Sequence, residues 1–275
     1  MPDQGRRVVL GRTGLSVARV GLGASFGAPT AAYEEAFERG LDYFYWGSLR
    51  KDGMGDAIRS IARQKREKLV VVIQSYARFG FVVRRSLESA LRRLRIEQAD
   101  VLLLGWHNSE PSNAIVDAAS ELVEKGRVRH VALSGHRRSL FPTLIDDDRY
   151  GLFHVRYNAV HRGAEREVFP ALSGKDATRR PGLVAFTATR WGHLCDARRT
   201  PPGERTPTGS DCYRFALSHP AVDVVLCGPD KREHVHQALA ALDLGAMTED
   251  ELAWMRRVGD HVYRGDVSST VRDQV

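Results

Sequence analysis

Residues 69–107, LVVVIQSYARFGFVVRRSLESALRRLRIEQADVLLLGWH, contain two apolar runs separated by one amphipathic segment. The runs, Leu69–Tyr76 and Ala99–His107, are apolar almost without alternation, which is typical of parallel strands buried on both faces. Between the two runs, apolar residues recur at helical spacing and arginines occupy the other face. The stretch therefore predicts a β-α-β unit, in which a helix joins two parallel strands.

The same alternation continues on both sides of this unit. Six further strands are expected: Val17–Ser25, Tyr43–Gly47, Val128–Gly135, Leu152–Asn158, Leu183–Thr189 and Ala221–Gly228. A closed barrel of eight such units usually needs about 250 residues, close to the length of this chain. An open doubly wound sheet usually carries a G-x-G-x-x-G turn after its first strand, and this sequence has none there. We predict an α/β fold, a (β/α)8 TIM barrel that forms a single domain over residues 1–275.

Three segments lie outside the repeat. Residues Arg7–Gly23 read as a β-hairpin, which would cap the N-terminal end of the barrel. The stretch Thr248–Asp260 reads as a C-terminal helix that begins with Thr248 as its N-cap. The segment Cys195–Ser210 is rich in proline, glycine and arginine, and we expect a long loop at the C-terminal face, where barrel active sites are built.

The composition narrows the classes of function. The net charge is +7, but the arginines are scattered beside acidic residues, which favours solvated helix faces over a nucleic-acid surface. No apolar run reaches the roughly 18 residues of a membrane span, and the N-terminus has no apolar signal segment. The three cysteines, Cys195, Cys212 and Cys227, are widely spaced and odd in number. We expect a cytoplasmic protein that acts on a small molecule, with no metal site and no nucleic-acid or membrane partner. The sequence leaves the oligomeric state undecided.

Several segments, taken in order, resemble the aldo-keto reductase family. They are RRVVLGRTGLSVARVGLG (6–23), AFERGLDYFYWG (36–47), REKLVVVIQS (66–75), ADVLLLGWH (99–107), KGRVRHVALSGH (125–136), YNAVHRGAEREVFPAL (157–172), GLVAFTATRWG (182–192) and ALSHPAVDVVLCGPDKREHVHQALAAL (216–242). The resemblance covers nearly the whole chain. It implies a barrel enzyme that reduces aldehydes and ketones with NADPH, the cofactor supplying hydride and the protein supplying position and electrostatics.

The four catalytic positions that the resemblance implies have all changed. Tyr45 stands at the family's aspartate, Arg50 at its tyrosine, Gln74 at its lysine and Gly105 at its histidine. The standard family mechanism is therefore not expected. We consider a rebuilt site in which Tyr45 or His107 is the acid or base and Arg50 is the electrostatic group, because a nearby cation stabilises a phenolate. In the alternative, Tyr45, Trp46 and Gln74 only fill the space of a lost site.

The cofactor positions implied by the resemblance are partly retained. Around the nicotinamide they fall on Ser134, His154 and Phe186, with Thr187 following as a phosphate-binding hydroxyl. In the loop after the last strand they fall on Gly228, Lys231 and Arg232. Asp230 in that loop opposes a 2′-phosphate, and the two cations beside it could compensate. The signature for NADP(H) is thus weakened, and the choice between NADP(H) and NAD(H) stays open.

Two functions follow from these patterns. The first is a non-standard NADP(H)-linked oxidoreductase, or an enzyme derived from one, that acts on a small organic substrate at the C-terminal face of the barrel. The second is a non-catalytic barrel, a pseudoenzyme that serves as a ligand-binding, cofactor-binding or partner protein. The aromatic and polar residue types at the altered positions favour the enzyme, because a decayed site more often shows small, inconsistent residues.

Overall fold

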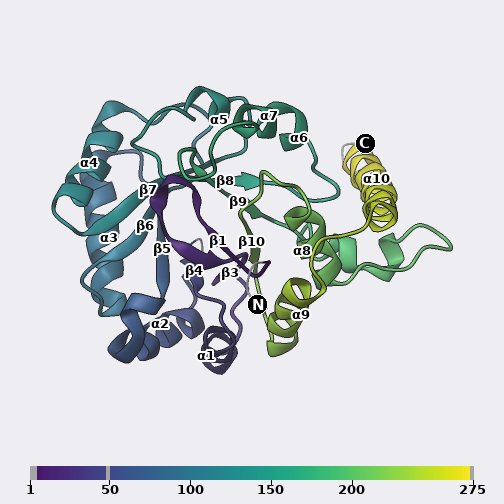
Figure 1. The fold of residues 1–275 in the computed structure, drawn as a ribbon, viewed down its shortest axis with the longest axis horizontal. Coiled ribbons are helices and arrows are strands. Elements are labelled where there is room, and N and C mark those ends of the chain that lie inside the picture. Colours follow the sequence, from purple (N-terminus) through teal and green to yellow (C-terminus); the bar gives the residue numbers. More distant parts are fainter. Residues whose placement is uncertain (1–4, 48–49, 273–275) are drawn as a thin grey trace.

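The computed structural model describes residues 5–47 and 50–272 and contains a closed barrel of eight parallel strands. The strands follow one another around the barrel in chain order, and β10 closes it against β3 (Figure 1). The strands are β3 (Val20–Gly23), β4 (Tyr43–Trp46), β5 (Val70–Ser75), β6 (Ala99–Leu104), β7 (Val128–Gly135), β8 (Leu152–Arg156), β9 (Gly182–Phe186) and β10 (Val224–Cys227). The predicted (β/α)8 barrel is confirmed.

Helices surround the barrel on its outer side (Figure 1). They are α1 (Thr30–Glu38), α2 (Asp52–Lys65), α3 (Gly80–Leu94), α4 (Asn113–Glu124), α5 (Leu140–Thr143), α6 (Ala164–Glu167), α7 (Phe169–Leu172), α8 (Gly209–Leu217), α9 (Arg232–Leu244) and α10 (Glu249–Arg272). In α3, Val83, Leu87 and Leu91 are buried at helical spacing, and the helix ends where Arg95 adopts a left-handed conformation. The β-α-β unit predicted for residues 69–107 is therefore present.

An antiparallel hairpin of β1 (Arg7–Val9) and β2 (Ser16–Ala18) closes the N-terminal end of the barrel. Leu10, Leu15 and Val17 of the hairpin belong to the same apolar cluster as the inward-facing strand residues, so they plug the barrel floor. The predicted strand Val17–Ser25 was wrong in its extent, because the chain changes partners at Arg19. The N–H of Arg19 donates to the hairpin, and its carbonyl accepts from Val225 of β10.

A buried ion pair ties the N-terminal ends of β9 and β10 together. The guanidinium of Arg180 donates two hydrogen bonds of 2.8 Å to the carboxylate of Asp223, and both side chains are almost fully buried. Asp223 also accepts from the N–H of Leu183 at 2.7 Å. The pair fixes the floor of the barrel on the side away from the strand ends that carry functional residues.

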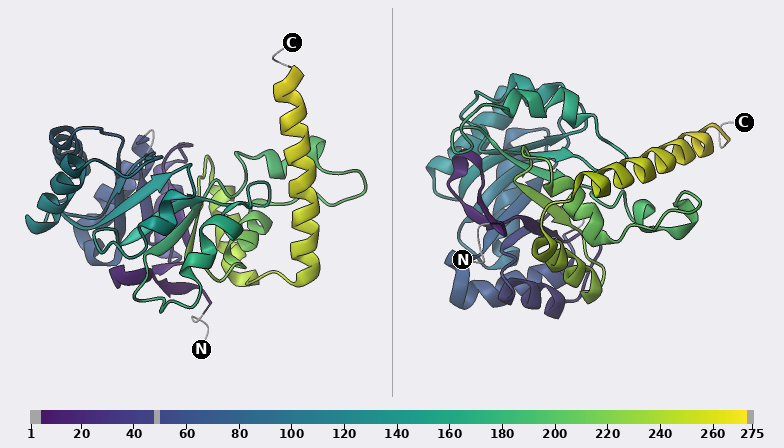
Figure 2. Two further views of the ribbon diagram at one scale, coloured as in Figure 1. Left: turned by 90° about the horizontal axis from the view of Figure 1, so that it is seen from above. Right: turned by 45° about the vertical axis from the view of Figure 1, so that its right-hand side comes forward.

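The C-terminal helix α10 packs on the barrel through Trp254 and Met255 and continues past it (Figure 2). The N–H of Glu251 donates to Thr248 Oγ1 at 3.3 Å, so the predicted N-cap is present, while the helix runs beyond the predicted end at Asp260. The long loop after β9 lies along α10, to which Arg199 is joined through Asp266 at 2.7 Å. Over the part of the chain that the structure describes, no helix is both long and apolar enough to cross a lipid bilayer.

Candidate active site

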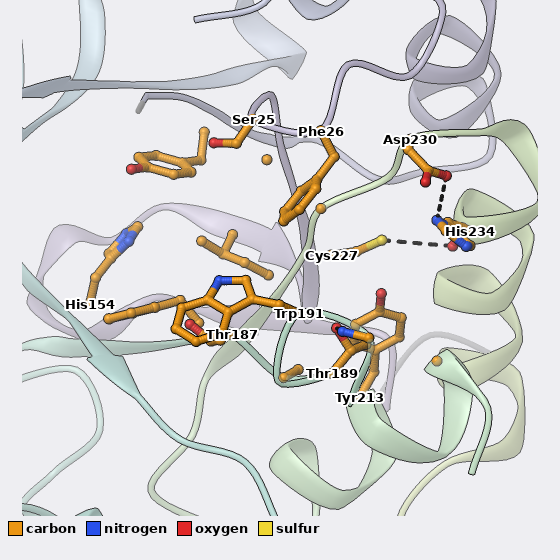
Figure 3. Close-up of a pocket in the computed structure, with 18 of the residues that line it drawn as sticks. Ser25, Phe26, His154, Thr187, Thr189, Trp191, Tyr213, Cys227, Asp230 and His234 are labelled. Atoms are coloured by element: carbon orange, nitrogen blue, oxygen red, sulfur yellow. Dashed lines mark hydrogen bonds and ion pairs between the residues drawn. The ribbon is translucent and has the colours of Figure 1, made fainter. Parts of the chain in front are cut away.

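A cavity of about 800 Å³ opens at the C-terminal ends of the strands. It begins among inward-facing strand residues such as Tyr45 and His154, and it reaches the first residues of α8 and the side chains of His234 and Gln237 on α9 (Figure 3). Pockets that enclose small ligands and cofactors span roughly 300–1,000 Å³. The cavity therefore has room for a large ligand at the face where barrel enzymes carry their sites.

Tyr45, Gln74 and Arg50 form one connected network at the barrel end of the cavity. The hydroxyl of Tyr45 donates to Oε1 of Gln74, and the guanidinium of Arg50 donates to the backbone carbonyl of Gln74. Tyr45 and Gln74 line the cavity, whereas Arg50 lies behind them, with its guanidinium carbon 5.4 Å from the centre of the Trp46 ring. Burial, and then repulsion from Arg93, lower the pKa of Arg50, and attraction to Tyr45 offsets only part of this; the guanidinium stays charged throughout. A fixed positive charge is thus coupled to the Tyr45 phenol.

Two glycines make room for the two polar side chains of this network. A Cβ atom at Gly47 would overlap the ring of Tyr45, and one at Gly105 would overlap the side-chain amide of Gln74. Gly105 stands where the family resemblance places a histidine. Tyr45 and Gln74 therefore occupy space that larger residues at these two positions would take.

His154 and Tyr43 form a buried pair on the strands beneath Tyr45. Nε2 of His154 lies 2.8 Å from the Tyr43 hydroxyl, and the His154 ring centre lies 5.5 Å from that of Tyr45. Burial lowers the pKa of His154 to about 3 and raises the pKa of Tyr43 well above its ordinary value. Both groups are neutral at physiological pH, so they act as a rigid polar floor rather than as proton carriers.

His107 does not lie in the cavity wall. The residue is 6% exposed, and its Nε2 atom is 3.2 Å from Nη1 of Arg78. Its backbone N–H donates to the carbonyl of Ser134. Burial, with the Arg78 charge, lowers the pKa of His107 to about 4. In the predicted strand Ala99–His107, alternation would turn His107 to the same side as Gly105, one layer closer to the barrel mouth. The strand instead ends at Leu104 and the chain turns at Trp106, where φ is 60°.

The histidine that lines the cavity on this side is His136, not His107. It follows β7 and lines the cavity, with ring centres 5.7 Å from Trp106 and 6.1 Å from Phe186, both in edge-on geometry. Burial, with the Arg156 charge, lowers the pKa of His136. This imidazole is a neutral hydrogen-bonding group beside the aromatic wall.

The residues proposed to hold the nicotinamide and the first phosphates lie together in the cavity wall. These are Ser134, His154, Phe186, Thr187 and Gly228. The Ser134 hydroxyl accepts from the backbone N–H of Trp106 at 3.2 Å, so it also supports the turn after β6. Thr187 has a positive φ of 63°, which sets the start of the loop after β9.

The two cations proposed for the cofactor phosphate are not in the wall. Nζ of Lys231 pairs with Glu233 at 2.9 Å, and Arg232 pairs with Glu35 of α1. Asp230 lines the cavity instead, and its carboxylate lies 3.0 Å from Nδ1 of His234 (Figure 3). In the wall as far as it is described, Lys and Arg are absent and Asp230 is the one acidic residue.

The start of α8 reaches the cavity with much of its hydrogen bonding already satisfied. Thr208 and Asp211 form a reciprocal capping box, and the N–H of Gly209 donates to Oε1 of Gln237 at 3.1 Å. Helix α9 begins without a side-chain cap, but the N–H of its third residue, His234, donates to the carbonyl of Lys231 at 3.2 Å, which leaves the N–H groups of Arg232 and Glu233 for an anion.

The structure also brings together cysteines that the sequence leaves apart. Sγ of Cys195, in the loop after β9, lies 3.9 Å from Sγ of Cys212 in α8, and Cys195 and Cys227 both line the cavity. Their sequence separation gave no sign of this contact, which depends on how the long loop folds back. Within residues 5–47 and 50–272, no group of three or more His, Cys, Asp or Glu side chains is arranged to hold a metal ion.

Comparisons with known proteins agree with this architecture. L-galactose dehydrogenase of Arabidopsis thaliana is 26% identical over 240 residues, which cover 76% of this chain and 73% of that protein. The holo form of an aldo-keto reductase from Bacillus halodurans superposes with a TM-score of 0.74 at 18% identity, covering 93% of this chain and 96% of that one.

An aldo-keto reductase from Klebsiella pneumoniae in complex with NADP and acetate gives a TM-score of 0.73 at 20% identity, covering 93% of this chain and 95% of that one. No protein-family model matches the chain. The resemblance to aldo-keto reductases is thus confirmed, and the TM-scores of 0.74 and 0.73 establish the shared fold.

Proposed function

We propose that the chain is a divergent aldo-keto reductase that binds a nicotinamide dinucleotide in the cavity and interconverts a carbonyl and an alcohol on a small organic substrate. The observation that carries this proposal is the Tyr45 phenol in the cavity wall, bonded to Gln74 and backed by the Arg50 guanidinium. When bound, the nicotinamide supplies or accepts hydride.

The fit of a dinucleotide is supported at both ends of the cavity. At the barrel end, Phe186 offers an aromatic surface and Ser134 offers a hydroxyl. At the other end, α9 begins without a side-chain cap, and the N–H groups of its first two residues suit a phosphate. Solved neighbours of the same fold contain NADP or NADPH, which makes a nicotinamide dinucleotide the ligand to test first.

Tyr45 holds the proton that the substrate oxygen needs. A free phenol has a pKa of about 10, so proton release at neutral pH requires a nearby positive charge. Arg50 supplies that charge, and Gln74 holds the resting hydroxyl by accepting its hydrogen bond. The hydroxyl turns from Gln74 to the substrate oxygen when it donates its proton. The exposed aromatic residues Trp106 and Trp191 border the cavity and would exclude water from a bound substrate.

The test is a binding and turnover assay on the full chain. Oxidised and reduced dinucleotides are titrated first, and turnover is then followed by nicotinamide absorbance with carbonyl compounds and with sugars, L-galactose included because of the Arabidopsis relative. We expect saturable dinucleotide binding and a substrate whose turnover depends on Tyr45.

A second function, a non-catalytic binding protein, is favoured by one observation: the described cavity wall contains no Lys or Arg to neutralise cofactor phosphates. This function predicts that no compound in the panel turns over, and the missing cations predict that its ligand is not a dinucleotide. Absence of binding at millimolar dinucleotide would therefore reject the oxidoreductase and retain the binding protein.

A further inference from the structure

The loop between β10 and α9 places a negatively charged side chain in the cavity wall, rather than a Lys or Arg. Gly228 and Asp230 both belong to the wall, and Asp230 lies 3.0 Å from His234, one turn into α9 (Figure 3). Asp230 directly precedes the uncapped start of α9, where the helix dipole favours a negative charge. The helix dipole and the contact with His234 thus both favour a carboxylate in this position.

The cations next to Asp230 in the sequence are directed elsewhere. Arg232 pairs with Glu35 on α1, and the same carboxylate also holds His236 at 2.9 Å. Hydrogen bonds from Arg232, and then from His236, lower the pKa of Glu35 to about 2, so this acid stays ionised and keeps Arg232 outside the cavity. Lys231 is joined to Glu233.

These charges distinguish the two forms of the dinucleotide. A 2′-phosphate carries a charge of about −1.5 to −2 at neutral pH and is normally held by Arg or Lys. A free ribose 2′-hydroxyl instead needs an acceptor, and a carboxylate is the acceptor that dinucleotide sites commonly use. Asp230 would repel the first and hydrogen-bond the second.

We infer that the site selects NAD(H) over NADP(H), with Asp230 as the specificity-determining residue. The inference rests on the proposed function, because it requires that a dinucleotide enters the cavity with its adenosine end toward α9. It departs from the NADPH dependence that the family resemblance implies, and it follows from where the side chains of residues 230–232 lie.

The experiment measures dissociation constants of the full chain for NADH and NADPH by tryptophan fluorescence and calorimetry, without any substrate. We expect NADH to bind at least about tenfold more tightly, the ratio that a difference of about 1.4 kcal/mol in binding free energy produces. In Asp230→Asn this ratio should shrink, and in Asp230→Arg it should reverse. ADP-ribose and ADP-ribose 2′-phosphate lack the nicotinamide, so titrations with these two ligands measure the effect of the 2′-phosphate at the adenosine end alone.

Lys231→Ala is the matched control, because it removes a cation of the same loop that the structure directs away from the cavity. It should leave both dissociation constants unchanged. Tighter binding of NADPH by the unmodified chain, lost in Lys231→Ala, would overturn the inference and leave the proposed function standing. Failure of both dinucleotides to bind would overturn the two together.

Discussion

Replacement of Tyr45 by phenylalanine removes one hydroxyl from the centre of the proposed active site. The ring keeps its place over Gly47, and the hydrogen bond to Gln74 is lost. One such bond contributes about 0.5–1.5 kcal/mol to the free energy of unfolding. Loss of a general acid lowers turnover by about 10²–10⁴-fold, which corresponds to about 3–5.5 kcal/mol of transition-state stabilisation.

The matched control is Tyr43→Phe, two residues earlier on the same strand. Tyr43 is fully buried and bonded to His154, and it is not among the residues that line the cavity. Its replacement leaves a buried imidazole nitrogen without its partner, which costs about 1–3 kcal/mol. For a chain of this size the midpoint of thermal unfolding should fall by about 2–12 °C.

The two variants are compared by thermal unfolding and by kcat and KM on a substrate found in the panel. We expect a crossed pattern, in which Tyr45→Phe loses kcat with little loss of stability and Tyr43→Phe loses stability but keeps kcat within about threefold. Full activity of Tyr45→Phe would refute the assignment of Tyr45 as proton donor. Loss of kcat in both variants to the same degree would show that the effect is structural.

Three further predictions concern the rest of the molecule. Asp223→Ala leaves Arg180 buried without its partner and should lower the free energy of unfolding, measured by urea denaturation, by about 3–5 kcal/mol. Lys175→Ala breaks an exposed pair and should lower it by less than about 1 kcal/mol, so equal effects of the two variants would contradict this. Hydrogen peroxide should oxidise Cys195 and Cys212 to a disulfide with release of water, since their sulfur atoms are 3.9 Å apart, and peptide mapping that finds both thiols free would exclude it. Three histidines have pKa values lowered to about 3 or 4: His107 and His154, which are buried, and His161, which is half-buried. They stay neutral in the folded chain but bind protons in the unfolded chain below about pH 6.5, so stability should fall as pH drops from about 6.5 toward 4, and a flat free energy of unfolding over that range would refute this.

The strands could be predicted because parallel barrel strands are buried on both faces and appear as apolar runs in the sequence. The break at Arg19 could not, because apolar residues continue on both sides of it and only the change of hydrogen-bonding partner separates β2 from β3. His107 was misplaced for a related reason, since strand alternation holds only while the backbone stays extended. The positive φ at Trp106 ends the extended backbone, and the alternation ends with it.

Charges in the last loop show a different limit of sequence reasoning. The family resemblance assigned Lys231 and Arg232 to the cofactor phosphate from their positions in the sequence. The direction in which a long side chain points, however, depends on the residues with which it pairs. The carboxylate that holds Arg232 belongs to Glu35 of α1, almost 200 residues earlier in the sequence. The Cys195–Cys212 contact is equally invisible, because it forms only when the loop after β9 folds back on α8.

The packing around Tyr45 bears on whether the site has decayed or has been rebuilt. A decayed site loses catalytic groups independently, and the space that they leave has no reason to match the residues that replace them. Here each new polar side chain lies over a glycine: Tyr45 over Gly47 and Gln74 over Gly105, and neither glycine could carry a Cβ atom unless its partner moved. The same two side chains are hydrogen-bonded to each other, and Arg50 is bonded to the backbone of Gln74. Five positions are thus mutually dependent: Tyr45 on β4, Gln74 on β5, the two glycines just after β4 and β6, and Arg50 before α2. This is the arrangement expected of a site that requires Tyr45 in one orientation.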